Sequence, residues 1–157
     1  MKIFDNLFIG SDHECRSGNF DVVIHACKTC HQKALVYTKS LPSNHPNYLT
    51  FLNSNHLYLN MVDMDKELMA MYTNPIMSAA IKFIEDNIQS KQILIHCNQG
   101  MSRSPSIGLL YLARRKVISD LSYDTAKSDF LRMYNLYNPG RGIERYLRNN
   151  WQQLIKL

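Results

Sequence analysis

The chain has 157 residues, a formal net charge of +5 at pH 7 and 45% hydrophobic residues. That length allows a real hydrophobic core, and no repeat, low-complexity tract or linker divides the sequence, so we expect one domain over residues 1–157. No opening stretch joins a basic start to a long apolar run, so we expect neither a signal peptide nor a membrane span.

The first half of the chain carries three strand signals and one helix signal. Residues 2–10 predict a hairpin, residues 21–26 a short apolar strand, and residues 57–62 the next strand. Asn74 and Pro75 predict the start of a helix, because proline is tolerated in a first helical turn. Strands separated by helical segments are typical of α/β proteins.

The second half continues this alternation. Residues 92–96 predict a buried central strand, Ser122 the cap of a later helix, and Asn138-Pro139-Gly140 a break before the last one. The residues at core spacing in the three predicted helices are Ile107, Leu110 and Tyr111, then Ala126, Phe130 and Met133, then Ile143, Tyr146, Leu147, Trp151 and Leu154. The order predicts an α/β fold with a central, mostly parallel sheet flanked by helices on both faces.

A cysteine pair follows the predicted strand 21–26. The stretch Cys27-Lys28-Thr29-Cys30-His31 matches a haem-attachment pattern, which we reject because attachment requires an exported chain. A zinc site would need two further ligands, for which His25, Cys15 and His13 are the nearby candidates. A redox pair and two incidental thiols are the other interpretations.

The most informative stretch is His96-Cys97-Asn98-Gln99-Gly100-Met101-Ser102-Arg103-Ser104, between a predicted strand and a predicted helix. Five residues separate Cys97 from Arg103, which lets the intervening N–H groups form a ring around one tetrahedral oxyanion. Only a thiolate attacks, and the positive end of the following helix lowers a thiol pKa from its usual ~8.5. The spacing predicts that Cys97 takes a phosphoryl group while the Arg103 guanidinium holds two of its oxygens.

The other residues of the motif have supporting roles in this interpretation. The predicted substrate contacts are Asn98, Gln99, Gly100, Met101, Ser102 and Arg103. Gly100 fits a sharp turn, often with positive φ, where a Cβ would obstruct the substrate oxygens. The Ser104 hydroxyl lies within reach of the sulfur and helps Cys97 depart, or it caps the helix. His96 is predicted to be structural, orienting the loop through backbone hydrogen bonds.

With these residues the chain resembles the cysteine-dependent protein tyrosine phosphatase superfamily, and within it the dual-specificity phosphatase-like branch. Its H-C-x-x-G-x-x-R-S motif is complete, and Tyr58–Asp63 and Tyr137–Ile143 resemble flanking segments of that family. The resemblance covers residues 3–151. It implies a single catalytic domain over 1–157, a protein tyrosine phosphatase-like fold, and hydrolysis through a cysteinyl phosphate without metal or cofactor.

The resemblance also implies an aspartate that protonates the leaving oxygen, on a loop some thirty residues before the cysteine. Asp63 lies 34 residues before Cys97 and Asp65 lies 32 residues before it. We prefer Asp63, because aligning the preceding strand places it where the acid of the family falls. Asp65 remains the alternative, with Glu67 behind both.

Charge bears on the substrate. Residues 103–157 hold ten Lys and Arg against four Asp and Glu, which would steer an anion towards one face. Within this excess, Arg141 is predicted to make a second phosphate or substrate contact. We expect a phosphoprotein substrate, no nucleic-acid partner, and a cytoplasmic location that keeps Cys97 reduced.

Two alternatives stay open. The chain could act on a non-protein substrate, namely a phosphoinositide, an RNA 5′-phosphate or a sugar phosphate. It could also be a phosphate-binding module without catalysis.

Overall fold

The computed structural model describes all 157 residues and contains a six-stranded sheet. The strands are β1 (Lys2–Phe4), β2 (Leu7–Gly10), β3 (Val22–His25), β4 (Thr50–Asn53), β5 (His56–Leu59) and β6 (Ile93–His96). Their spatial order is β1-β2-β6-β3-β5-β4. β2, β6, β3 and β5 run parallel, and only the two edge pairs, β1 with β2 and β4 with β5, are antiparallel.

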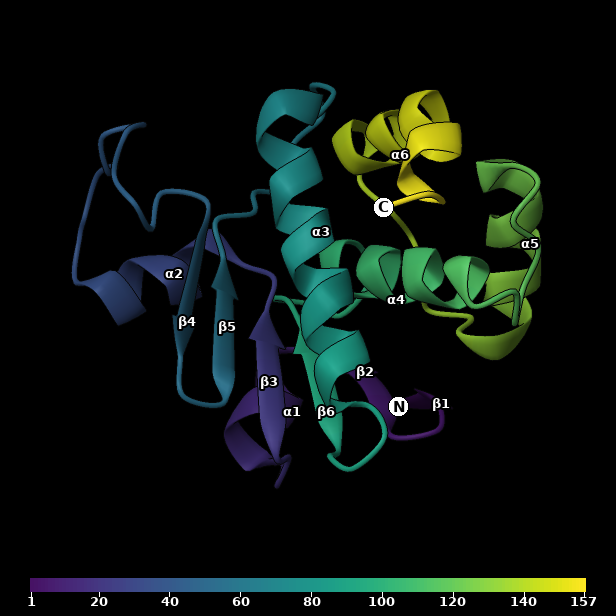
Figure 1. The fold of residues 1–157 in the computed structure, drawn as a ribbon, viewed down its shortest axis with the longest axis horizontal. Helices are drawn as coiled ribbons and strands as arrows, with labels where there is room; N and C mark the ends of the chain where they lie inside the picture. Colours follow the sequence, from purple (N-terminus) through teal and green to yellow (C-terminus); the bar gives the residue numbers. More distant parts are fainter.

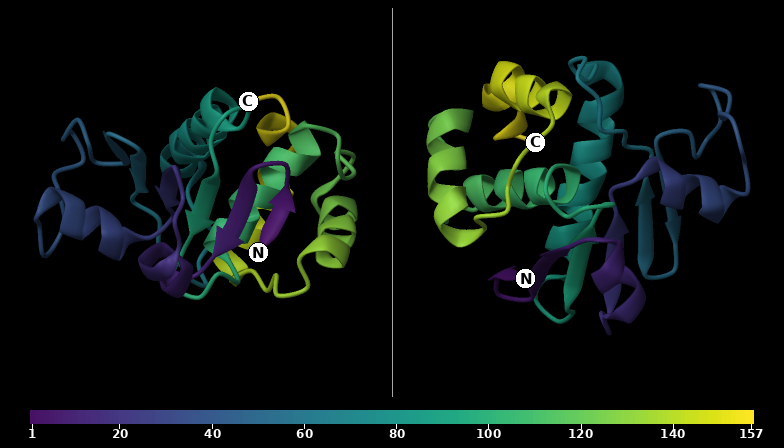
Figure 2. Two further views of the ribbon diagram at one scale, coloured as in Figure 1. Left: turned by 90° about the horizontal axis from the view of Figure 1, so that it is seen from below. Right: turned by 180° about the vertical axis from the view of Figure 1, so that it is seen from behind.

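Six helices cover the two faces of this sheet. They are α1 (Asp12–Ser17), α2 (Lys28–Leu35), α3 (Ala70–Asn87), α4 (Arg103–Arg114), α5 (Tyr123–Met133) and α6 (Arg141–Leu154). α1 and α2 lie on one face, and the four longer helices gather on the other, with α4 nearest to β6 (Figures 1 and 2). None of these helices is both long enough and apolar enough to cross a membrane.

The middle of the sheet positions the functional loop. β6 lies between β2 and β3, and all four of its residues are buried, as are all four residues of β3. A strand covered on both faces has no solvent side, which explains its continuous apolar run. β3 and β6 are in register with His25 opposite His96, so both strands end at the same edge of the sheet.

Most of the predicted elements are confirmed. The hairpin at residues 2–10, the strands at 21–26 and 92–96, and the Ser122 cap all form as expected. All five predicted core positions of α6 are buried. The prediction for Met133 is wrong, because this last residue of α5 is 37% exposed.

Two predicted boundaries are also wrong. β5 ends at Leu59, three residues before Val62. α3 begins at Ala70 rather than at Asn74, so Pro75 lies inside the helix. The missing N–H of Pro75 leaves the carbonyl of Met71 without a helical donor, and Met71 is 65% exposed, so water can reach it.

Candidate active site

The motif folds as a tight loop between β6 and α4. β6 ends at His96, Cys97 follows with 2% of its surface exposed, and α4 begins at Arg103. We call residues 97–103 the Cys97 loop. Because the loop joins the carboxyl end of a central parallel strand to the N-terminus of a helix, it has the placement that α/β proteins use to bind anions.

The amides of this loop have no partner in the protein. The six backbone N–H groups of residues 98–103 donate to no acceptor within the chain. Asn98 and Gln99 are exposed, but Gly100, Ser102 and Arg103 are buried. Buried amides are almost always hydrogen-bonded, so these three need an acceptor from outside the chain. A run of N–H groups at a helix N-terminus favours an anion there.

Neighbouring elements hold the loop from outside. Tyr134 donates its hydroxyl to the Gly100 carbonyl at 2.6 Å, and Asn138 donates its backbone N–H to the Met101 carbonyl at 2.8 Å. Burial and the neighbouring Cys97 raise the pKa of Tyr134 to about 12, so this hydroxyl remains a donor at neutral pH. The Ser102 hydroxyl accepts from the Gly140 amide at 2.9 Å, so it anchors the turn before α6.

Gly100 is needed for its backbone conformation and for a close contact with β2. Its φ of +72° confirms the sharp turn. A Cβ at this position, however, would lie 2.9 Å from the Gly10 carbonyl oxygen, at the end of β2. The glycine therefore allows the loop to pack against β2, and the need for room beside the substrate oxygens stays a prediction.

Arg103 donates hydrogen bonds to two oxygen atoms of the protein. Its Nη1 donates to the Met61 carbonyl at 3.2 Å and its Nη2 to the Asn98 Oδ1 at 2.7 Å. Its Nε is buried, has no hydrogen-bond partner, and lies 4.0 Å from an Asp63 carboxylate oxygen. An arginine fixed in this way keeps its guanidinium plane oriented before any ligand arrives.

Ser104 lies on the protein side of the sulfur. Its hydroxyl is fully buried and 3.2 Å from both the Cys97 Sγ and the Gly10 carbonyl oxygen. The cap position of α4 is Ser102, which makes no side-chain cap bond. The capping alternative for Ser104 is therefore wrong, and its single hydroxyl proton is placed to go to either the sulfur or the Gly10 carbonyl.

Only one of the two candidate acids lines the pocket that contains the Cys97 sulfur. A cavity of about 220 Å³ is lined by Asp63, Cys97, Asn98, Gln99, Ser102 and Arg103. Asp65 does not line it. Asp65 faces an adjoining hollow of about 330 Å³, which it shares with Asp63, Met101 and the turn at residues 138–140. A Cβ at Gly140 would overlap the Asp63 carboxylate, so this glycine leaves room for Asp63 beside the pocket.

Three of the predicted substrate contacts, Gly100, Met101 and Arg141, do not line the pocket, and neither does the third candidate acid, Glu67. Arg141 is the exposed first residue of α6 and lines neither of these hollows. Glu67 accepts hydrogen bonds from Asn149 Nδ2 at 3.0 and 3.1 Å, away from Cys97. Met101 lines only the outer hollow.

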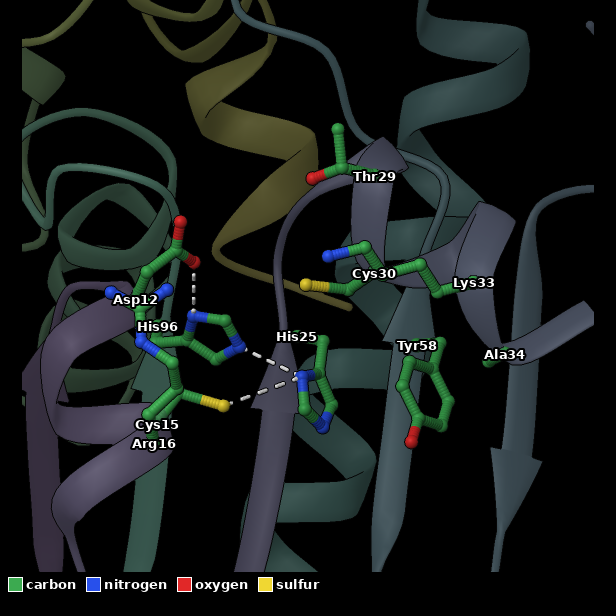
Figure 3. A pocket seen from close by; sticks show the side chains of 10 residues that line it. All are labelled: Asp12, Cys15, Arg16, His25, Thr29, Cys30, Lys33, Ala34, Tyr58 and His96. Carbon is green, nitrogen blue, oxygen red and sulfur yellow. Dashed lines mark hydrogen bonds and ion pairs between the residues drawn. The ribbon is translucent and has the colours of Figure 1, made fainter. Parts of the chain in front are cut away.

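His96 is held by its side chain as well as by its backbone. Its Nε2 is 2.7 Å from His25 Nδ1 (Figure 3). His25 Nε2 is in turn 2.9 Å from His56 Nδ1, which makes a chain of three imidazoles. The His96 backbone carbonyl accepts from the Ala26 amide at 2.8 Å. Burial lowers the pKa of His96, and it lowers that of His25 to about 3, so both rings are neutral at pH 7.

This histidine chain was not predicted from the sequence. His25, His56 and His96 are separated by 31 and 40 residues, and no local spacing connects them. Only the pairing of β3 with β5 and β6 brings them together.

The chain is similar in sequence to a known phosphatase, although no family model matches it. A dual specificity protein phosphatase, YVH1 of Plasmodium falciparum (isolate 3D7), is 36% identical over 93 residues, which is 58% of this chain. This chain spans only 15% of the length of that relative.

Solved structures match over the whole chain. The structure of DUSP15 has a TM-score of 0.64 at 17% identity and covers 99% of this chain and 92% of its own. PTPMT1, crystallised in complex with PI(5)P, has the same TM-score at 15% identity and covers 99% and 96%. The predicted fold class and the predicted resemblance to the dual-specificity phosphatases are both confirmed.

Proposed function

We propose that this chain, which has the fold and sequence signature of the dual-specificity branch of the cysteine-dependent protein tyrosine phosphatases, is a catalytic domain that hydrolyses phosphomonoesters. The observation that carries the proposal is the Cys97 loop itself. Six amides without an acceptor in the chain and the buried, unpartnered Nε of Arg103 belong to the same short loop as one nearly buried sulfur. That arrangement provides donors for the equatorial oxygens of a phosphoryl group.

The first step forms a covalent intermediate. The Cys97 thiolate attacks phosphorus, the bond to the ester oxygen breaks, and Asp63 gives its proton to that leaving oxygen. The loop amides and Arg103 bind the equatorial oxygens as charge redistributes among them. Asp63 lines the same pocket as Cys97, and its carboxylate lies 4.0 Å from Arg103 Nε, which supports its role as the acid for the leaving oxygen.

The second step releases phosphate. The Asp63 carboxylate takes a proton from water, the water oxygen attacks phosphorus, and the phosphorus–sulfur bond breaks. The sulfur leaves as a thiolate, and the Ser104 hydroxyl, 3.2 Å away, donates a hydrogen bond to it. Atoms and charge balance without a metal or redox cofactor. The chemistry needs a reduced thiol, which supports a cytoplasmic location.

We propose phosphoproteins as the substrate class, with phosphotyrosine and phosphoserine or phosphothreonine both accepted. The sequence similarity to a dual specificity protein phosphatase supports this choice. A non-protein phosphomonoester is the second candidate, because PTPMT1, a structure of the same fold, was crystallised with PI(5)P.

The proposal is tested by p-nitrophenyl phosphate hydrolysis with the wild type, Cys97→Ser and Cys15→Ser. We expect turnover in the wild type and in Cys15→Ser, which changes a thiol outside the Cys97 loop. In Cys97→Ser we expect a loss on the order of 10⁴-fold or more. Retained turnover in Cys97→Ser would rule out the proposed nucleophile.

The substrate class is tested with the Asp63→Ala variant, which should bind substrate without releasing product rapidly. A panel of phosphopeptides, phosphoinositides, RNA 5′-phosphates and sugar phosphates then ranks the classes by binding and by wild-type kcat/KM. Tight phosphopeptide binding by a wild-type protein that hydrolyses none of the panel would instead indicate a phosphate-binding module.

A further inference from the structure

A second group of reactive side chains lies on the other side of the β6 end. The ligand atoms of Asp12, Cys27, Cys30 and His96 all lie within 4.8 Å of one another. We call these four residues the His96 cluster. None of its members has a role in the proposed phosphatase chemistry, although His96 immediately precedes Cys97 and Asp12 accepts a hydrogen bond from Asn98 Nδ2 at 3.4 Å.

Three separate segments build the cluster. Cys27 is the residue before α2 and Cys30 lies in its first turn, Asp12 is the first residue of α1, and His96 ends β6. Figure 3 shows Asp12, His96 and the Cys30 sulfur converging on one space from these elements. From the sequence, a zinc site at Cys27 and Cys30 lacked two ligands. The fold supplies Asp12 and His96 rather than the nearby candidates considered there.

The surroundings of one His96 nitrogen favour a bound cation. His96 is 1% exposed, and its Nδ1 is buried without a hydrogen-bond partner, 3.4 Å from an Asp12 carboxylate oxygen. Its other nitrogen, Nε2, is engaged with His25 at 2.7 Å. In the tautomer that donates from Nε2 to His25, the Nδ1 lone pair faces the carboxylate and the thiols, where only a cation or a donor satisfies it.

We propose that Asp12, Cys27, Cys30 and His96 bind a divalent zinc ion. Two thiolates, one imidazole and one carboxylate are a tetrahedral donor set that zinc prefers, and the thiolates disfavour magnesium and calcium. Both thiols lose their protons to solvent on binding. Bond lengths of about 2.0–2.3 Å place tetrahedral ligand atoms about 3.3–3.8 Å apart, so the cluster closes by about 1 Å around the ion.

Access and charge both fit the proposal. A cavity of about 390 Å³ opens onto Asp12, Cys30 and His96. Two thiolates, one carboxylate and a zinc ion leave a net charge of −1, and Arg16 and Lys33 line the same cavity. The half-exposed Asp12 and Cys30 supply the mobile ligands, while the buried Cys27 and His96 are fixed.

The neighbouring group of Cys15, His25 and His96 is a weaker candidate. Its three ligand atoms are also within 4.8 Å of one another. However, His25 uses both of its nitrogens in the imidazole chain, to His96 and to His56. Binding a metal there would break a hydrogen bond that the His96 cluster leaves intact.

A zinc ion at the His96 cluster would join α1, α2 and β6 directly behind the Cys97 loop. His96 is covalently next to Cys97, so the ion would fix the strand end from which the loop departs. We therefore expect metal binding to raise the thermal midpoint of the whole chain. The site itself is independent of phosphatase activity, so failure of either proposal leaves the other standing.

The test is a cobalt titration of the full chain, reduced and stripped with a chelator, followed by displacement with zinc. We expect one equivalent of cobalt with a thiolate-to-cobalt charge-transfer band, and loss of the band on adding zinc. Cys30→Ser and Asp12→Asn change half-exposed ligands, so both variants should fold. Each should weaken zinc affinity by more than the ~10–100-fold typical of an outer-shell partner. Cys15→Ser, the matched control, should bind like the wild type.

Three results would overturn the proposal. One is the absence of a charge-transfer band in reduced wild-type protein with native circular dichroism. Another is equal zinc affinity in the wild type, Cys30→Ser and Asp12→Asn, which would indicate adventitious binding. The third is a loss of the band in Cys15→Ser but not in Cys30→Ser, which would assign the metal to the neighbouring group.

Discussion

The Cys97 loop and the His96 cluster contain adjacent residues of the chain, His96 and Cys97, and favour ligands of opposite charge. At the end of β6, His96 turns towards α1 and α2, and Cys97 turns towards α4, because successive strand side chains point to opposite faces. On the α4 side, free amides and Arg103 favour an anion. On the other side, a carboxylate, two thiols and an imidazole lone pair favour a cation.

The difference shows how one strand end can support two sites without mixing their charges. The end of β6 lies between the two groups, and burial keeps His96 neutral there. They meet at one point, where Asn98 Nδ2 donates to an Asp12 carboxylate oxygen at 3.4 Å. Variants on the α4 side should therefore affect chemistry, and variants on the other side should affect stability and metal binding. A substitution that changed both sets of properties would break this division.

The largest effect is expected for Arg103→Lys. A lysine provides a single ammonium in place of a planar fork and cannot hold two phosphoryl oxygens together. We expect kcat/KM for p-nitrophenyl phosphate to fall on the order of 10³-fold, with little change in thermal midpoint. The exposed Arg115→Lys, which makes the same change of side chain away from the pocket, should retain wild-type kinetics. A loss below tenfold in Arg103→Lys would exclude the bidentate role.

The next effect separates the two candidate acids. Asp63→Asn should lower kcat on a poor leaving group by about 10²-fold or more, because the amide cannot give a proton to the ester oxygen. Asp65→Asn should keep wild-type kcat on the same substrate, since Asp65 lines only the outer hollow. The reverse pattern would make Asp65 the acid.

The Cys97 loop could be predicted from sequence because its parts are consecutive. Nucleophile, amides and arginine occupy adjacent positions in the chain, and the helix start that orients them follows at once. The same holds for α6, where the apolar stripe alone identifies the buried face. Local pattern was sufficient wherever the interacting residues share one element.

Prediction failed where the contacts are distant in sequence. The requirement for Gly100 comes from β2, some ninety residues earlier, and the His96 cluster draws on residues 12, 27, 30 and 96. α1 is a different case, because Ser11 and Glu14 form a capping box whose spacing is visible in the sequence, although this helix was not predicted. Pro75 led us to predict the start of α3 too late, because the true N-cap residue, Met69, makes no side-chain cap bond that the sequence could indicate.

A smaller effect is expected for Ser104→Ala. The hydroxyl donates to the Cys97 sulfur, and hydrogen bonds to charged groups contribute about 1.5–3 kcal/mol, or about 10- to 100-fold in rate. Because the thiolate is the leaving group only in the second step, breakdown of the cysteinyl phosphate should slow while its formation continues. Rapid mixing should then show a burst of p-nitrophenol. Ser106→Ala, whose hydroxyl contacts Tyr137 instead, should show none.

The smallest effect on chemistry is expected on the other side of β6. His25→Phe keeps an aromatic ring but removes both hydrogen bonds of the imidazole chain, leaving His96 Nε2 buried without a partner. An unsatisfied buried group of this kind costs about 1–3 kcal/mol, to be measured by urea denaturation of the metal-free protein. His56→Phe breaks only the outer link at an exposed residue and should cost less than about 1 kcal/mol.

Both variants should keep kcat within about threefold of wild type, since neither ring touches the Cys97 loop. A kcat loss in His25→Phe as large as that in Ser104→Ala would mean that the orientation of His96 controls the sulfur, and the two sides of the strand would then be coupled rather than separate.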